Sequence, residues 1–199
     1  ELYKIFTYAF DLRPRLYTAL KNSGFLEEAR LKDHCFFDGN YSDVLYHACF
    51  NPRHGIRIRP ADEDDCQLLF TWANDRTVRL NSNSSEPIEW KNHKAWYRKS
   101  LRSKDTKIFI FQNSQNQAVG QLRVNFDQGE WQIGYSLDRN FRGLGLGKEI
   151  VRLALAEIPN AVFKAQVRKK NVSSSRVFQS LGFTLESSTD DSYFYKYLK

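Results

Sequence analysis

The segment RNFRGLGLGKEI, residues 139–150, places Gly143, Gly145 and Gly147 at alternate positions, with Lys148 and an apolar helical run behind them. A strand, a turn without side chains and a helix N-terminus together present unpaired backbone N–H groups at the positive end of a helix dipole. Such an end binds anions, most often phosphate, and glycine permits the close backbone approach. The segment therefore predicts a phosphate-binding loop.

The spacing of the glycines excludes two common phosphate loops. The dinucleotide pattern GxGxxG would need a glycine at Lys148. The nucleoside triphosphate pattern GxxxxGK[ST] would need a glycine at Arg142 and a hydroxyl at Glu149. The pattern that remains is Arg-x-x-Gly-x-Gly, formed by Arg142, Gly145 and Gly147 between a strand and a helix.

This pattern resembles the pyrophosphate-binding motif of the GNAT acetyltransferase superfamily. The segment NVSSSRVFQSLGF also resembles the family's Asn-x-x-Ser…Leu-Gly-Phe segment, through Asn171, Ser174 and Gly182. The resemblance covers residues 56–199. It implies the GNAT acyltransferase fold with a mixed α/β sheet, acetyl-coenzyme A as the cofactor without a metal, and transfer of the acetyl group to a primary amine.

The resemblance also assigns the cofactor site. Main-chain groups of the strand before the loop are expected to hold the pantetheine arm, and backbone amides of the loop are expected to hold the pyrophosphate. Asn171 and Ser174 would either contact the cofactor or cap a helix, since both residue types are common caps. The cofactor residues are then Tyr135, Ser136, Leu137, Arg142, Gly143, Leu144, Gly145, Leu146, Gly147, Lys148, Asn171 and Ser174.

The reaction requires a base for the amine proton and an acid for the leaving thiolate. Where many relatives carry a carboxylate and a tyrosine, this sequence has Gln132 and Phe178, which can serve in neither role. Glu130 and His93 are the candidate bases, acting through water, unless the amine arrives neutral. Ser174 is the candidate proton donor, as the nearest hydroxyl.

The acceptor side carries a narrower resemblance. Residues 72–96, WANDRTVRLNSNSSEPIEWKNHKAW, are similar to GNAT domains that accompany bacterial nonulosonic-acid and amino-sugar biosynthesis. This implies an amine on a nucleotide-linked amino sugar, with Arg79, Asn81, Ser82 and Trp96 as the substrate-binding candidates. The polar residues here could instead form only a loop. His93 and Trp96 could equally belong to an aromatic core face.

Two other functions remain open from the sequence. The chain could acetylate the N-terminal amine of a protein or peptide. It could also be a degenerate module that binds acyl-coenzyme A without turnover, since Gln132 and Phe178 replace the usual catalytic types.

The elements that position these residues follow from hydrophobic periodicity. Asp62 has the character of a helix N-cap, with acids in the first turn behind it. Strands are expected at 57–60, 107–113, 118–126, 130–137 and 161–169, helices at 62–74 and 89–101, and a helix behind the glycine loop. A helix ending at Gly182 and two closing strands complete a domain over 56–199.

Residues 1–52 resemble the C-terminal half of a second, degenerate GNAT copy, with strand, helix and hairpin in that order. Gly24 follows the first helix as Gly182 follows the last. Arg13 and Leu16 stand where the motif has Asn and Ser, so cofactor contacts in this copy are in doubt. A half-copy cannot bury its own sheet face, so we expect it to pack on the complete domain, on a missing upstream half or in a homodimer.

Composition limits the partners. The formal net charge is +7, but Lys and Arg are scattered, which favours an acidic small molecule over nucleic acid. No apolar run reaches the roughly 18 residues of a membrane span, so no membrane partner and a cytoplasmic location are expected. The three cysteines lack metal-site spacing and are expected to be reduced.

Overall fold

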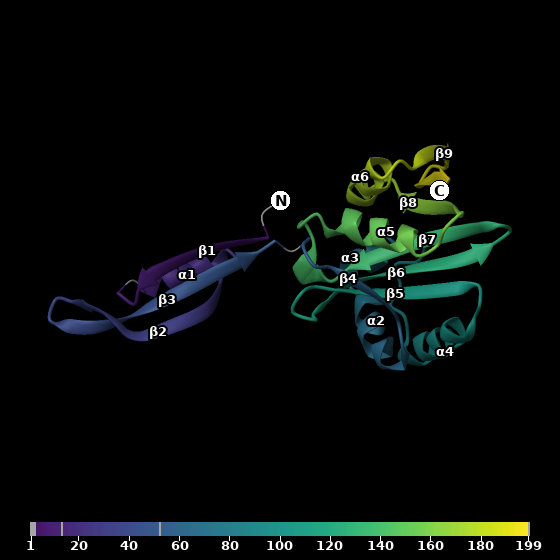
Figure 1. The fold of residues 1–199 in the computed structure, drawn as a ribbon. Helices are drawn as coiled ribbons and strands as arrows, with labels where there is room; N and C mark the ends of the chain where they lie inside the picture. The colour runs from purple at the N-terminus through teal and green to yellow at the C-terminus, as the bar shows by residue number, and fades with distance from the viewer. Residues whose placement is uncertain (1–2, 13, 52, 199) are drawn as a thin grey trace. The chain divides into compact units, whose positions relative to one another are not determined.

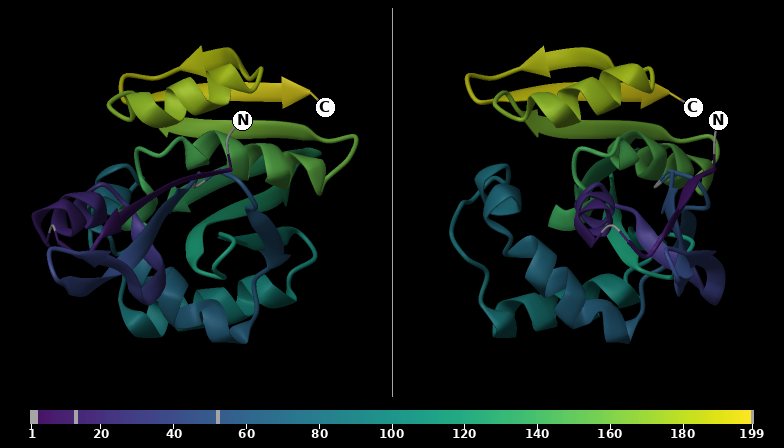
Figure 2. Two further views of the ribbon diagram at one scale, coloured as in Figure 1. Left: turned by 60° about the vertical axis from the view of Figure 1, so that its left-hand side comes forward. Right: turned by 90° about the vertical axis from the view of Figure 1, so that its left-hand side faces the viewer.

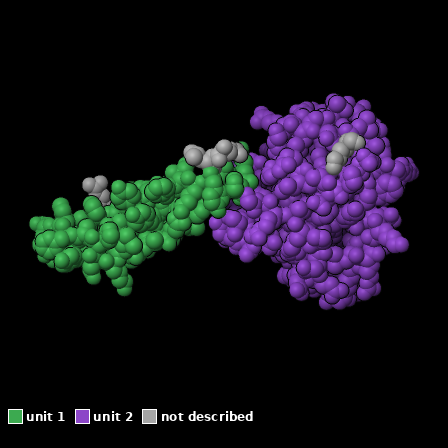
Figure 3. Space-filling model, in the orientation of Figure 1, with its two compact units in different colours: residues 1–54 green, residues 55–199 purple. Residues whose placement is uncertain are grey.

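The computed structural model describes residues 3–12, 14–51 and 53–198 (Figure 1). Arg13, one of the residues in which the first copy departs from the motif, lies outside the described residues. The chain divides into two compact units, residues 1–54 and 55–199, which Figure 3 colours separately. We call them unit 1 and unit 2 and describe each by itself.

Unit 2 contains a seven-stranded sheet in the order β4-β5-β6-β7-β8-β10-β9. All described neighbours are antiparallel except β7 and β8, which are parallel. In Figure 2, β8, β9 and β10 run side by side at the top of the unit. The strands are β4 (Arg57–Pro60), β5 (Thr106–Gln112), β6 (Ala118–Asp127), β7 (Glu130–Leu137), β8 (Val162–Arg168), β9 (Thr184–Ser188) and β10 (Ser192–Leu198).

The helices of unit 2 follow the predicted order, with two short additions, α3 and the 3-10 helix η2. The predicted helix at 62–74 is a short 3-10 turn, η1 (Glu63–Asp65), followed by α2. The five-residue helix α3 was not predicted, because it is too short to show a periodicity. The remaining elements are α2 (Cys66–Ala73), α3 (Arg76–Leu80), α4 (Trp90–Arg102), η2 (Arg139–Phe141), α5 (Leu146–Ala156) and α6 (Val172–Ser180).

Helices cover both faces of this sheet. On β5, Phe109 and Phe111 pack in a core cluster with residues of α5 and α6. Ile108 and Ile110, on the opposite face of the same strand, pack with residues of α2 and α4. A strand buried on both faces is apolar without alternation, which explains the run KIFIF. The mixed sheet confirms the predicted fold class.

The start of α2 is fixed by charges close in sequence. Asp62 caps the turn, accepting from the backbone N–H of Asp64, and Asp65 accepts from the backbone N–H of Asp62 at 3.0 Å, as predicted for an N-cap at Asp62. Arg59 on β4 donates two hydrogen bonds to the Asp65 carboxylate, at 2.6 and 2.7 Å. These contacts anchor the helical layer to the edge of the sheet.

The pairing of β7 with β8 is short. The two strands share only the register pairs Trp131 with Phe163 and Gln132 with Lys164. Beyond Gln132, β7 continues to pair with β6 but no longer with β8. The sheet is therefore split along one line, and backbone groups of β7 along that line are left for another partner.

Unit 1 consists of β1 (Lys4–Phe10), α1 (Pro14–Asn22), β2 (Leu26–Phe37) and β3 (Asn40–Phe50), with strand order β1-β3-β2. The hairpin turns at Asp38 and Gly39, both with positive φ. The segment β8-α6-β9-β10 of unit 2 has the same element order and the same strand order, β8-β10-β9. Gly24 and Gly182 follow the corresponding helices with φ of +83° and +88°.

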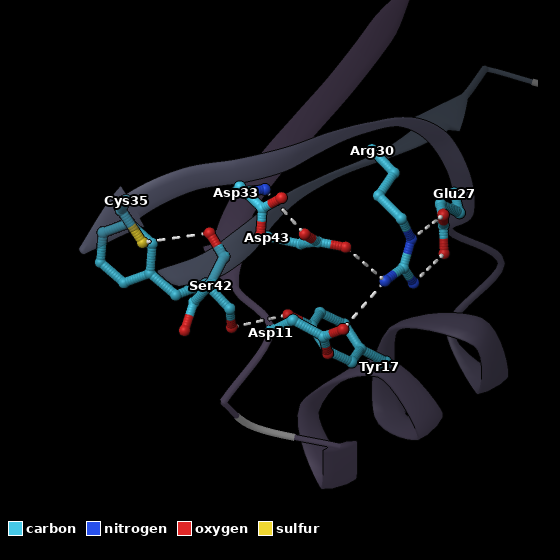
Figure 4. Close-up of polar contacts among 9 residues, drawn as sticks. Asp11, Tyr17, Glu27, Arg30, Asp33, Cys35, Ser42 and Asp43 are labelled. Atoms are coloured by element: carbon cyan, nitrogen blue, oxygen red, sulfur yellow. Dashed lines mark hydrogen bonds and ion pairs between the residues drawn. The ribbon is translucent and has the colours of Figure 1, made fainter. Parts of the chain in front are cut away.

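A charged cluster ties the strands of unit 1 together (Figure 4). Arg30 on β2 contacts Asp11 at 2.9 Å, Glu27 at 3.1 Å and Asp43 at 3.2 Å. Tyr17 of α1 donates a hydrogen bond to the backbone oxygen of Phe10. The cluster fixes α1 and the end of β1 against the hairpin.

The sheet of unit 1 exposes an apolar face. Register pairs place Phe6 beside Ala48, and Tyr8 beside Tyr46, on the same side. Phe6 and Tyr8 are each 61% exposed. On the same side of the sheet, Ala48 is buried, so these two exposed apolar side chains are those of β1.

Candidate functional site

A cleft of about 1180 Å³ lies in unit 2 where β7 and β8 separate. Its lining comes from β6, β7 and β8, from α2 to α4, from the glycine loop and from the start of α6. The sequence-predicted residues that line it are Arg79, Asn81, Ser82, His93, Trp96, Tyr135, Ser136, Leu137, Arg142, Gly143, Gly145, Gly147, Asn171 and Ser174.

The glycine loop has a backbone that side chains disfavour. Gly143 and Gly145 both have φ of +77°, in the left-handed region that glycine enters without strain. Gly145 is the N-cap of α5 and supplies no side-chain cap. The N–H groups of the first helical turn have no acceptor within the helix, so the loop fits an anionic group.

Gly147 serves a different purpose from its neighbours. A Cβ at this position would lie 3.2 Å from the Tyr135 hydroxyl and 3.3 Å from Val177 Cγ2. Glycine therefore allows α5 to begin in close contact with β7 and α6. On β6, a Cβ at Gly120 would lie only 2.7 Å from the backbone oxygen of Ser136, so this strand also requires glycine to approach β7.

The side chain of Arg142 is engaged within the protein. It donates to the backbone oxygen of Leu137 at 3.1 Å and to the Asp75 carboxylate at 2.8 Å. Burial, the largest single influence, would raise the pKa of Asp75, but the hydrogen bond and charge of Arg142 and the backbone N–H groups of Val78 and Thr77 together lower it. The charge of Arg142 is thus offset by Asp75, and its side chain ties the loop to the start of α3.

The side chains of the other loop residues contribute little to the proposed anion site. Leu146 is fully buried in the core, and Leu144 is 40% exposed outside the described cleft lining. Lys148 is exposed and is also absent from that lining. The expected contribution of Lys148 to the anion site is therefore at most a long-range charge.

At the start of α6, Asn171 caps the helix and also lines the cleft, so its cofactor contact stays a prediction. Its side-chain oxygen accepts from the backbone N–H of Ser174 at 3.2 Å, so Asn171 caps the helix. The Ser174 hydroxyl donates to the Tyr135 hydroxyl oxygen at 3.2 Å. The Tyr135 ring packs edge-on against Phe178, with ring centroids 5.8 Å apart.

The side chain of Tyr135 is a functional candidate that the sequence did not indicate, because only its backbone was expected to matter. Burial raises the pKa of Tyr135, so the phenol is protonated at neutral pH. Its oxygen already accepts from Ser174, which leaves the phenolic proton available to another acceptor. The Tyr135 phenol thus places a proton donor beside Phe178, the position at which many relatives carry a tyrosine.

Glu130 does not lie in the described lining of the cleft. Its carboxylate contacts Lys164 and Lys196, each at 2.9 Å, and their hydrogen bonds lower its pKa. A carboxylate held by two ammonium groups is a weak base. The structure therefore removes Glu130 from the candidate bases.

His93 of α4 lines the cleft and is only 2% exposed. Its Nε2 lies 3.1 Å from the backbone oxygen of Cys66, which can only accept, so Nε2 carries the proton and Nδ1 carries the lone pair. Burial lowers the pKa of His93, and the ring is neutral at pH 7. The His93 ring also packs between Phe70 and Trp96. His93 is therefore part of an aromatic cluster and, at the same time, remains a candidate base.

On the acceptor side, two predicted residues use their polar groups locally. Asn81 donates to the backbone oxygen of Thr77 at 3.0 Å, and Ser82 donates to that of Val78 at 2.7 Å. Both contacts finish α3, as expected for a polar loop. Arg79 donates to the backbone oxygen of Ser84 and completes the turn.

The charge of the cleft is one-sided. Five cationic side chains line it, and no Asp or Glu among the described residues does. The sequence indicated neither Arg123 nor Arg168 for this role, because single arginines within apolar strands give no spacing signal. The five are Arg79, Arg123, Arg142, Arg168 and Lys170.

Comparison with known families decides what this fold is. Residues 56–184 match the family described as Acetyltransferase (GNAT) domain. The chain belongs to the GNAT acetyltransferase family. This membership confirms the resemblance inferred from the glycine loop and the prediction of an acetyltransferase domain.

Relatives of this GNAT chain agree on the fold. An uncharacterized protein of Methanocaldococcus jannaschii is 29% identical over 136 residues, 64% of this chain and 28% of that protein, so the chain spans about a quarter of that relative. A crystal structure of a domain from Methanocaldococcus jannaschii is 22% identical, with a TM-score of 0.64, and covers 72% of this chain and 98% of its own. Spermidine N-acetyltransferase from Vibrio cholerae, in complex with CoA and spermine, is 16% identical, with a TM-score of 0.65, and covers 72% and 95%.

In the part of the GNAT chain that the structure describes, no group of three or more His, Cys, Asp or Glu could hold a metal ion. Cys35, Cys49 and Cys66 are free thiols, as predicted. None of the described helices is both long and apolar enough to span a membrane.

Proposed function

We propose that unit 2 transfers the acetyl group of acetyl-coenzyme A to the primary amine of an anionic small molecule, a nucleotide-linked amino sugar. The observation that carries this proposal is the charge of the cleft lining, which holds five cations and no described carboxylate. Asp75 and Asp191, outside the lining, pair with Arg142 and Arg168. Arg79, Arg123 and Lys170 have no ion pair among the described residues and carry the excess positive charge. A diphosphate group is held by arginine and lysine side chains. A polyamine would require carboxylates, so the acceptor of the Vibrio cholerae neighbour does not suit this lining.

The cofactor assignment rests on three features of the chain. The left-handed Gly143 and Gly145 open the N-terminus of α5, which suits a pyrophosphate. The backbone of β7 beyond Gln132 is not paired with β8, which suits the amide groups of a pantetheine arm. Acetyl-coenzyme A supplies the acetyl group as a thioester, which is activated for attack by an amine.

Two side chains, His93 and Tyr135, transfer the protons that the attack of the amine on the thioester requires. His93 accepts the proton of the acceptor amine at Nδ1, because burial keeps its ring neutral and Nε2 is committed to Cys66. Tyr135 gives its phenolic proton to the departing sulfur. The hydrogen bond from Ser174 then stabilises the phenolate oxygen, so the serine predicted as the proton donor acts through Tyr135.

A panel of amines tests the proposed acceptor. Release of free thiol from acetyl-coenzyme A would be followed with a nucleotide-linked amino sugar, the same sugar without the nucleotide, spermidine and a peptide with a free N-terminus. We expect the highest kcat/KM with the nucleotide-linked sugar. Turnover of the peptide alone would support N-terminal acetylation instead, and tight cofactor binding without turnover of any amine would support a binding module.

We also infer that unit 1 is the C-terminal half of a degenerate second GNAT copy. The order strand-helix-hairpin and the strand order β1-β3-β2 support this, since β8-α6-β9-β10 has the same arrangement. The two positive-φ glycines, Gly24 and Gly182, support it as well. The exposed apolar sheet face around Phe6 and Tyr8 is the surface such a half-copy needs covered.

A further inference from the structure

Arg123 lines the cleft and has no hydrogen-bond or ion-pair partner among the described residues. It lies on β6, where the register pairs it with Ile108 of β5 and Gly134 of β7. Its guanidinium carbon lies 5.1 Å from the centre of the Trp96 ring on α4. The side chain is thus held against an aromatic surface inside the cleft.

The other arginines around unit 2 show what Arg123 lacks. Arg142 contacts Asp75 at 2.8 Å, and Arg168 contacts Asp191 at 2.9 Å. Within the described residues, Arg123 has neither an ion pair nor a hydrogen bond, and desolvation lowers its pKa. An arginine removed from water without a carboxylate is costly unless a ligand supplies the charge.

The cleft leaves room for such a ligand. Gly134 lies opposite Arg123 on the neighbouring strand, and a Cβ there would meet no heavy atom within 4 Å. Trp96 is 38% exposed and offers a flat surface beside the guanidinium. A planar guanidinium with open space in front of it suits an oxyanion that accepts two hydrogen bonds.

The position of Arg123 separates it from the cofactor loop. Its neighbour Ile108 belongs to the core cluster on the α2 and α4 face of the sheet, the same side as His93 and Trp96. Tyr135, which contacts the helices after the glycine loop, packs in the cluster on the other face. An anion at Arg123 therefore belongs to the acceptor and not to the cofactor pyrophosphate.

We propose that Arg123, supported by Trp96 and facing the space at Gly134, forms a subsite for an oxyanion of the acceptor, either a phosphoryl or a carboxylate group. The proposal rests on the proposed function only in taking the acceptor to be an anionic amine. It places the anion on the same face as the candidate base, so binding of the anion would orient the amine toward His93.

The first test compares Arg123→Gln with a matched control, Lys107→Gln. Lys107 also lies over a tryptophan, 5.5 Å from the Trp131 ring centre, but is absent from the cleft lining. With an anionic acceptor, Arg123→Gln should raise the acceptor KM at least ten-fold while KM for acetyl-coenzyme A stays unchanged. With an uncharged amine it should change neither value, and Lys107→Gln should match the wild type throughout.

The second test measures binding without turnover. UDP and glucuronic acid would be titrated calorimetrically into the protein with coenzyme A in excess, so that the glycine loop is filled. Loss of UDP binding in Arg123→Gln assigns a phosphoryl subsite, and loss of glucuronic acid binding assigns a carboxylate subsite. Arg123→Lys, which keeps the charge but loses the paired donors, should bind with intermediate affinity.

Two outcomes keep this inference separate from the proposed function. If the wild type acetylates no nucleotide-linked sugar but still binds a probe through Arg123, the subsite stands and the proposed acceptor fails. If Arg123→Gln is folded by circular dichroism and binds both probes as the wild type does, the subsite is refuted, whatever the acceptor is.

Discussion

Replacing Tyr135 by phenylalanine removes a single oxygen atom from the cleft. The ring contact with Phe178, at 5.8 Å between centroids, is preserved, and so is the backbone of β7. If Tyr135 protonates the leaving sulfur, kcat should fall by about 100-fold, near the lower end of the range for general acid catalysis. That factor corresponds to about 2.7 kcal/mol in the activation free energy.

Ser174→Ala should have a smaller effect than Tyr135→Phe. It removes one hydrogen bond to the phenolic oxygen, worth about 1 kcal/mol, so kcat should fall about five-fold. If the cofactor contacts Tyr135 only through its backbone, as proposed, KM for acetyl-coenzyme A should stay within about two-fold of the wild type in both variants, a change of about 0.4 kcal/mol in binding free energy.

The matched control for Tyr135 is Tyr195→Phe. Tyr195 is buried, also packs against Phe178 and accepts a hydrogen bond from Gln179, but is absent from the cleft lining. Steady-state thiol release and thermal unfolding would be measured for each variant. If Tyr135→Phe loses activity no more than Tyr195→Phe does, the phenol of Tyr135 is structural and the proton comes from elsewhere.

Three further predictions concern the same cleft. Gly145→Val should weaken coenzyme A binding at least ten-fold, about 1.4 kcal/mol by calorimetry, because its φ of +77° disfavours a branched side chain; equal affinity in a folded variant would move the pyrophosphate elsewhere. kcat/KM should rise with pH as His93 loses its proton, with the midpoint of the rise below the usual histidine pKa, because burial lowers the pKa of His93; an identical rise in His93→Gln would exclude His93 as the base. Gly120→Ala should lower the unfolding free energy by about 1–3 kcal/mol in chemical denaturation, because the added Cβ meets the Ser136 oxygen at 2.7 Å; unchanged stability would mean that β6 and β7 shift apart at no cost.

The elements of this fold were predictable where their signals are local. Asp62 caps the start of the α2 segment, and Gly182 ends α6 in the left-handed region, each through contacts within a few residues. The helix α3 was missed because its five residues complete too few turns to show a period. The ion pairs of Glu130 were not predictable for a different reason, since Lys164 and Lys196 are distant in sequence and only the sheet brings them to it.

The contrast between signals that are local in sequence and contacts between distant residues also applies to the cleft. It explains why the cofactor side could be predicted from the sequence better than the acceptor side. The cofactor is proposed to bind through backbone amides. Recognition of that kind needs glycines at set spacing, which Gly143, Gly145 and Gly147 display in the sequence. The proposed acceptor subsite uses side chains from separate elements, Arg123 on β6 and Trp96 on α4, which no spacing rule connects. Because a fold can keep its cofactor loop while these side chains change, membership of the GNAT family specifies the donor, and the charge of the cleft must specify the acceptor.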